Sequence, residues 1–177
     1  KKYFKAVLAG TNKIEIQEAT YRLAILDYEN GNLGPIQIFI DSNPNSDFSY
    51  DGINVMIRYY RGIENLAYEL KYYEQLIKYF PSSSNALNRY AWRMSELEMN
   101  LEDALMKIKK AIVMTHADPR QANIIDTEAE ILWKLKRYDD AIKSIEDAIL
   151  IEPDNEYFKD QKEKFLESKN KKQLQSV

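Results

Sequence analysis

The side chains that most often carry catalysis or bind metals are scarce in this sequence. It has one histidine, His116, and no cysteine. A transition-metal site needs several imidazole or thiolate ligands, so His116 has no partners with which to build one. Any Ser-His-Asp arrangement would also have to centre on His116, in the loop of residues 115–121. We expect His116 to be an ordinary surface residue.

The acidic residues form no catalytic or calcium-binding pattern. Asp118, Asp139 and Asp140 offer carboxylates, but no glycine-centred calcium loop surrounds them. Glu128 and Glu130 are two positions apart on an expected helix, where their side chains diverge by about 200°. The sequence also lacks a glycine-rich phosphate loop, a nucleophile elbow and an HExxH string. We therefore expect no enzymatic activity, no metal and no cofactor.

The charge balance argues against nucleic acid as a partner. The chain has 25 Lys and Arg against 28 Asp and Glu, a formal net charge of -3. This balance gives no positive field that would gather nucleic acid or anionic lipid. The 13 tyrosines could stack on single-stranded bases, but most fall on expected core stripes. A modest basic group is formed by Arg58, Arg61, Arg89 and Arg93.

No segment has the pattern of a membrane span or a signal peptide. No apolar run approaches the roughly 20 residues that a bilayer-crossing helix needs. The lack of cysteine excludes disulfides but does not identify a compartment, and the oligomeric state is equally open. The chain starts at Lys1 rather than at Met. An apolar stripe at helical spacing begins within its first residues and comprises Tyr3, Phe4, Val7 and Leu8. We expect a piece of a longer chain.

The second half of the chain repeats with a period of 37 residues. Such a period is typical of stacked helical repeats. The first set is Leu101, Ala104, Leu105, Ile108, Ala111 and Ile112, and the second is Tyr138, Ala141, Ile142, Ile145, Ala148 and Ile149. Because alanine recurs at two of these positions, we predict that two helices approach closely there.

A second helical pattern precedes each of these stripes, so each repeat is predicted to be a helical hairpin. The earlier patterns are Leu87, Tyr90, Ala91, Met94 and Leu97, and then Ile125, Ala129, Leu132 and Leu135. Prolines follow the hairpins at similar intervals, where a helix tends to stop. They are Pro44, Pro81, Pro119 and Pro153.

The last hairpin resembles the tetratricopeptide repeat. The residues that match that family's pattern are Tyr138, Ala141, Ala148 and Pro153. The preceding unit is similar through its alanines, with a hairpin loop that we expect to be one residue longer. The resemblance implies an all-α fold, a right-handed superhelical array of antiparallel helix-turn-helix repeats with a C-terminal capping helix.

Two residues depart from that family's pattern. Glu128 takes a position that is usually large and apolar, and Lys136 replaces the common turn glycine. These departures concern local packing rather than the fold.

The expected plan treats residues 1–177 as a single repeat domain. It comprises the end of a preceding helix at 1–10, a degenerate repeat at 11–46, repeats at 47–83, 84–119 and 120–153, a capping helix at 154–168 and a tail at 169–177. Ile36, Ile38 and Ile40 alternate as in a strand, but helix is preferred because no partner strand is predicted. The repeat at 47–83 places either Glu69 or Leu66 in its small-residue position.

The resemblance also implies where a partner binds. In tetratricopeptide arrays the first helices of successive repeats line a groove that accepts a peptide. The corresponding positions are Asn85, Asn88, Trp92, Ser95 and Glu96 in one repeat and Asn123, Asp126, Glu130, Trp133 and Lys134 in the next. We call these ten residues the predicted groove face.

The two tryptophans of the predicted groove face allow two interpretations. Each ring can anchor a partner, or it can pack between adjacent hairpins. The mixture of Asp126 and Glu130 with Lys134 argues against a site for a peptide's C-terminal carboxylate.

The resulting expectation is a non-catalytic scaffold that binds a protein or peptide. The alternative is a helical accessory domain of a larger bacterial enzyme or secretion component, for example a thioredoxin-like one, whose catalytic part precedes residue 1.

Overall fold

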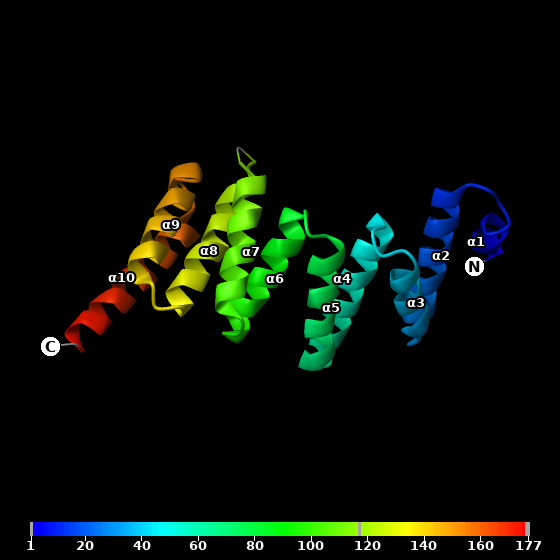
Figure 1. The fold of residues 1–177 in the computed structure, drawn as a ribbon, viewed down its shortest axis with the longest axis horizontal. Coiled ribbons are helices and arrows are strands. Elements are labelled where there is room, and N and C mark those ends of the chain that lie inside the picture. The colour runs from blue at the N-terminus through cyan, green and yellow to red at the C-terminus, as the bar shows by residue number, and fades with distance from the viewer. Residues whose placement is uncertain (1, 117, 176–177) are drawn as a thin grey trace. The chain divides into compact units, whose positions relative to one another are not determined.

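The computed structural model describes residues 2–116 and 118–175, and every regular element in that part of the chain is a helix. Residue 1 and the last two residues of the expected tail lie outside the described residues. The chain divides into two compact units, Lys1–Pro81 and Ser82–Val177. Each unit is built from helices that pair with their neighbours along the chain (Figure 1).

The first unit contains five helices. They are α1 (Lys2–Val7), α2 (Lys13–Tyr28), α3 (Gly34–Ser42), α4 (Asp47–Gly62) and α5 (Leu66–Tyr79). Its core comes from one face of each of the four longer helices, and includes Tyr21, Phe39, Ile53, Met56, Tyr72 and Leu76. The pairs α2–α3 and α4–α5 form the hairpins of this unit.

The segment with alternating isoleucines is helical, so the strand alternative is wrong. Pro35 stands in the first turn of α3, where its fixed φ suits a helix and its missing N–H costs nothing. Ile36 and Ile40 are buried on one face, whereas Ile38 is 67% exposed. Gly52 of α4 meets that face, since a Cβ atom there would lie 3.3 Å from the Ile40 side chain.

The burial of two α5 side chains decides between the two alignments of the 47–83 repeat that the sequence left open. Glu69 is 2% exposed, whereas Leu66 is 38% exposed. The inward position of α5 is therefore occupied by Glu69, in the register that aligns Pro81 with Pro153.

The second unit also contains five helices. They are α6 (Ser84–Leu97), α7 (Leu101–Met114), α8 (Gln121–Lys134), α9 (Tyr138–Ile151) and α10 (Glu156–Leu174). The four alanines of the sequence repeat, Ala104, Ala111, Ala141 and Ala148, are fully buried. This burial agrees with the close helix contact predicted from their size.

The connections inside both hairpins of the second unit span three residues, 98–100 and 135–137. The α6–α7 connection is therefore as long as the α8–α9 connection, although the sequence predicted one additional residue in it. Instead, Glu98 and Asn100 both have a positive φ, whereas Lys136 alone does so in the α8–α9 connection, at 60°. Lys136 thus adopts the left-handed conformation that glycine would adopt without strain.

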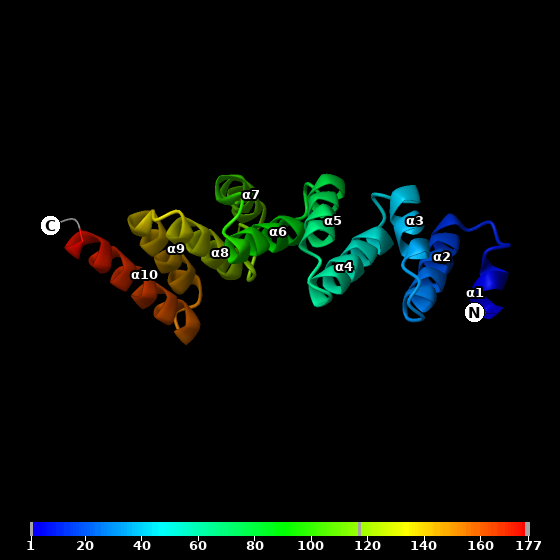
Figure 2. The ribbon, with the colours of Figure 1, turned by 90° about the horizontal axis from the view of Figure 1, so that it is seen from below.

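Helix α10 extends beyond the predicted capping segment and through the part of the expected tail at residues 169–174. Contacts with α9 explain the additional turns. Lys169 forms an ion pair with Asp139, and the Lys172 ammonium lies 5.5 Å from the centroid of the Tyr138 ring. Figure 2 shows α10 running beside α9.

Candidate functional site

The α6 part of the predicted groove face is partly open. Asn85 and Glu96 are exposed, and Asn88 and Trp92 are half-buried. Ser95 is 1% exposed, and its hydroxyl donates a 2.7 Å hydrogen bond to the Trp92 carbonyl oxygen of the same helix. Ser95 is therefore a packing residue, while the other four side chains reach the surface.

Two polar groups in this part of the face have no partner among the described residues. The Asn88 side-chain oxygen is buried without a hydrogen-bond donor. The Trp92 indole N–H likewise donates no hydrogen bond to a described residue, and its ring contacts no other described ring. A buried acceptor without a donor costs free energy.

The α8 part of the predicted groove face is mostly covered. Asn123 is exposed and Lys134 is half-buried, but Asp126 and Glu130 are buried, at 7% and 9% exposed. Lys134 forms a 2.8 Å ion pair with Glu98 of the α6–α7 connection.

Helix α10 provides the cover. Its Lys164 ammonium binds the Glu130 carboxylate at 2.6 Å, and the Trp133 indole N–H donates a 2.8 Å hydrogen bond to the Ser168 hydroxyl. The rings of Trp133 and Phe165 stack with their centroids 5.9 Å apart. Tyr157 of α10 also forms a hydrogen bond with Asp126 of α8. We call these α8–α10 contacts the α10 ladder.

The α10 ladder encloses an unfavourable pair of carboxyl groups. Burial, and next the charge of Glu130, raise the pKa of Asp126 to about 7, although Lys164 and the Tyr157 hydrogen bond act in the opposite direction. One Asp126 oxygen, Oδ1, has no hydrogen-bond partner among the described residues. Burial, and next the charge of Asp126, also raise the pKa of Tyr157 to about 12.

Helix α10 therefore covers only some of the ten predicted residues. Asp126, Glu130 and Trp133 contact α10, whereas Asn85, Asn88 and Trp92 remain outside the α10 ladder. The sequence showed the aromatic residues of α10, but not that its Lys164 and Ser168 would meet α8. That pairing depends on how two helices separated by α9 align, and no local spacing encodes it.

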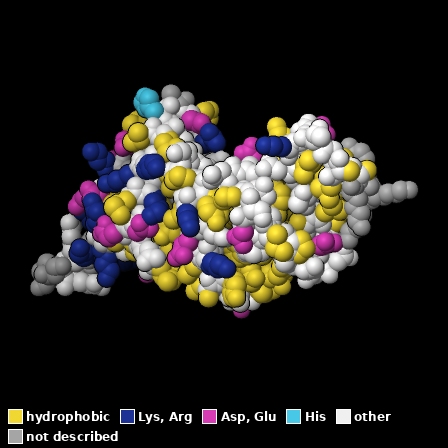
Figure 3. Space-filling model, turned by 45° about the vertical axis from the view of Figure 1, so that its right-hand side comes forward, with side chains coloured by type: hydrophobic (Ala, Val, Ile, Leu, Met, Phe, Trp, Pro, Cys, Tyr) yellow, Lys and Arg dark blue, Asp and Glu magenta, His cyan; other side chains and the backbone are white. Residues whose placement is uncertain are grey.

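Other residues considered for chemistry lie apart from this face. His116 is exposed in the segment that follows α7, and Figure 3 shows it as the single cyan side chain. Within the described residues, no three His, Cys, Asp or Glu side chains gather as a metal site would require. Over the same residues, no helix has both the length and the apolar character needed to cross a bilayer.

Comparison with known proteins identifies the fold. No family model matches the chain, and no curated protein matches it. Among solved structures it is similar to PilF of Pseudomonas aeruginosa, a protein containing tetratricopeptide repeats, with a TM-score of 0.65 and 13% sequence identity. The alignment covers 89% of this chain and 70% of the PilF chain. The predicted all-α, tetratricopeptide-like repeat fold is thereby confirmed.

Proposed function

We propose that the protein is a non-catalytic scaffold that binds a protein or peptide on the predicted groove face of its second unit. The α6 residues Asn85, Asn88 and Trp92 make the main contacts, and Glu96 and Asn123 border them. Asp126, Glu130 and Trp133 act indirectly, because they hold α10.

This proposal rests on one observation, the difference between the contacts of the two tryptophans. The Trp133 indole is hydrogen-bonded to Ser168 and stacked on Phe165. The half-buried Trp92 has neither kind of contact within the described residues, and the unpaired Asn88 oxygen belongs to the same helix. A large amphipathic ring that reaches the surface is the kind of side chain that anchors interfaces.

The fold supports the same proposal. Helical repeat proteins commonly use surfaces made by successive helices to bind other proteins. The likeness to PilF extends only to the fold at this level of identity. The choice of partner class therefore depends on the chemistry of the predicted groove face.

A single-tryptophan protein tests the proposal. In a Trp133→Phe background, Trp92 is the only tryptophan, so its fluorescence reports on its own surroundings. A partner, first identified by affinity capture, is titrated into this protein, and we expect the Trp92 emission to shift to shorter wavelength as the ring leaves water.

Calorimetry with two alanine variants provides the matched control. Trp92→Ala should weaken binding by about tenfold or more, which corresponds to a buried anchor. Met106→Ala removes an exposed apolar side chain of α7 and should leave the affinity unchanged. A partner released by Met106→Ala but not by Trp92→Ala would contradict the groove assignment.

A further inference from the structure

Helix α10 supplies only one cation to the two buried carboxyl groups of α8. Asp126 and Glu130 are 7% and 9% exposed and lie four positions apart, on the same side of α8. The Lys164 ammonium binds Glu130 at 2.6 Å, whereas Asp126 has no ion pair with a described residue and its Oδ1 has no hydrogen-bond donor there. Lys134 of α8 pairs with Glu98 instead. The negative charge of this site is therefore only half compensated.

Gln161 of α10 lies where a second cation is missing. It accepts a 2.9 Å hydrogen bond from the Lys164 ammonium. It also forms a hydrogen bond with Tyr157, which in turn is bonded to Asp126. The neutral Gln161 amide thus connects the two α10 side chains that reach the carboxyl groups. A helix with Lys or Arg at this position, three residues before the lysine that binds Glu130, would bring a charge to Asp126.

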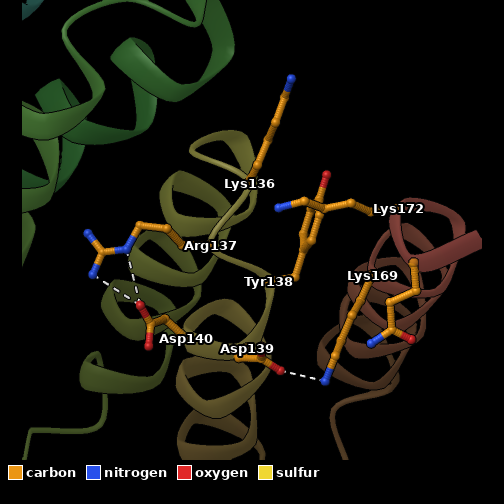
Figure 4. Close-up of a pocket in the computed structure, with 8 residues that line it drawn as sticks. Lys136, Arg137, Tyr138, Asp139, Asp140, Lys169 and Lys172 are labelled. Atoms are coloured by element: carbon orange, nitrogen blue, oxygen red, sulfur yellow. Dashed lines mark hydrogen bonds and ion pairs between the residues drawn. The ribbon is translucent and has the colours of Figure 1, made fainter. Parts of the chain in front are cut away.

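The attachment of α10 is weak for a helix of its length. Of its 19 residues, only Phe158 and Phe165 are buried. Its last turns are held to α9 by exposed contacts such as the Lys169–Asp139 ion pair, and such pairs add little to stability. Figure 4 shows this pair joining the two helices beside an open pocket of about 690 Å³. A competing helix would therefore displace few buried contacts.

From this geometry we infer that the α8 part of the predicted groove face binds a basic helical segment of a partner protein, which displaces α10 and brings one cation to each buried carboxyl group. This inference rests on the proposed function and deepens it, because the same face then holds its partner through α8 as well as through α6. While α10 is docked, Asp126 and Glu130 serve only its attachment.

The contacts of α10 show what else the partner segment must contain. Lys164 covers the Trp133 ring while it binds Glu130, and the neighbouring Phe165 stacks on the same ring. A replacement therefore needs an aromatic residue beside its lysine as well as the second cation. A helical segment of a protein provides all three groups, whereas a small polyamine provides cations alone.

Two labelled peptides test this inference by fluorescence anisotropy with the full chain. Both have the sequence of residues 155–175 and carry fluorescein, and one of them, the lysine peptide, has the change Gln161→Lys. The assay is run at pH 8, above the Asp126 pKa of about 7, so that both carboxyl groups are charged. Docked α10 competes at an effective concentration on the order of 1 mM. We expect the lysine peptide to bind about tenfold more tightly than the unaltered peptide, with half-saturation at roughly 0.1 mM.

Nuclear magnetic resonance shows whether the lysine peptide replaces α10. When only the chain is labelled with nitrogen-15, the peptide contributes no amide signals. We expect the α10 amide signals to move to the positions of an unfolded segment as the lysine peptide binds. Binding that leaves these signals unchanged would place the peptide elsewhere and overturn the inference.

An isosteric substitution tests the role of Asp126. In the Asp126→Asn chain no second carboxylate needs a cation, so the two peptides should bind within about twofold of each other. Asp147→Asn changes the net charge equally but lies on α9, at a hollow that faces away from α10 and is lined by Lys109 and Glu128. The tenfold advantage of the lysine peptide should persist in this control.

The same change within α10 should have the opposite effect on binding. Gln161→Lys in the full chain lets α10 compensate Asp126 itself, so the lysine peptide should bind about tenfold more weakly. Asp160→Asn alters the net charge by the same amount at an exposed neighbouring position and should leave the affinity unchanged.

Three further results would overturn the inference. They are equal affinities of the two peptides for the unaltered chain, equal effects of Asp126→Asn and Asp147→Asn, and release of α10 by millimolar spermidine alone. Trp92→Ala should leave peptide binding unchanged. A failure of the lysine peptide is therefore distinguishable from a failure of the α6 contacts, which are measured through Trp92.

Discussion

The ammonium nitrogen of Lys164 lies 4.0 Å from the centroid of the Trp133 ring. The same ammonium binds the Glu130 carboxylate at 2.6 Å, so one α10 side chain compensates a buried acid and covers an indole. Through this contact, two residues of the predicted groove face serve the attachment of α10.

Removing Lys164 should loosen α10. We expect Lys164→Ala to lower the free energy of unfolding by about 1–3 kcal/mol, because Glu130 is left buried without its cation and Trp133 loses its cation–π contact. Urea denaturation measures the change. The control is Lys162→Ala, whose 2.7 Å pair with Glu146 is more exposed and should contribute at most about 1 kcal/mol. Equal losses in the two variants would show that the α10 ladder does not depend on Lys164.

Stability should depend on pH through Asp126. Its pKa is about 7 in the folded chain against an ordinary value of 3.8, so the folded state binds the proton more tightly than the unfolded state. The stabilisation is therefore complete below about pH 4 and is lost as the pH rises through about 7.

Asp126→Asn should remove this dependence. Thermal melting between about pH 4 and about pH 8 should show a decline for the unaltered chain and a flatter profile for the variant. If both proteins show the same slope over this range, the titrating group is not Asp126.

Lys136→Gly should stabilise the second unit by about 0.5–1 kcal/mol. A non-glycine residue in the left-handed region costs roughly 1–2 kcal/mol, which glycine avoids at the expense of some unfolded-state entropy. Arg137→Gly is the control, since Arg137 has a φ of -91° and glycine brings no conformational relief there. A lower midpoint for Lys136→Gly would contradict the strain argument.

The small-residue contact between α8 and α9 should not tolerate a larger side chain. Ala141 is fully buried, and we expect Ala141→Leu to destabilise the fold by about 1–3 kcal/mol through overpacking. The neighbouring Asp140→Ala changes an exposed side chain that pairs with Arg137, and should cost at most about 0.5 kcal/mol. Equal denaturant midpoints would mean that the helix interface has been misplaced.

The sequence predicted the hairpins of the second unit well because their packing depends on local spacing. Ala104 and Ala141 mark positions where only a small side chain fits, and this constraint repeats with the helix period. The alternating isoleucines were ambiguous, since Ile36, Ile38 and Ile40 satisfy a strand pattern as readily as a short helix. Pro35 and the contact with Gly52 resolve the ambiguity, and the second of these is tertiary.

The coverage of the predicted groove face was not predictable in the same way. Position within the repeat predicted that Asp126, Glu130 and Trp133 face a groove, but which of these side chains would be exposed to solvent depended on α10. The partners that α10 supplies include Lys164 and Ser168, and polar residues of this kind are equally common on solvated helix faces. Only the alignment of two non-consecutive helices distinguishes these roles.

The α10 ladder also bears on how the second unit opens. Its hydrogen bonds from Trp133 to Ser168 and from Lys164 to Glu130 join residues 35 and 34 positions apart, and the hairpin partner α9 fills the interval. In repeat architectures each element depends mainly on its neighbours. We therefore expect α10 to detach before the rest of the second unit unfolds. The amide hydrogens of α10 should exchange with solvent deuterium sooner than those of α8.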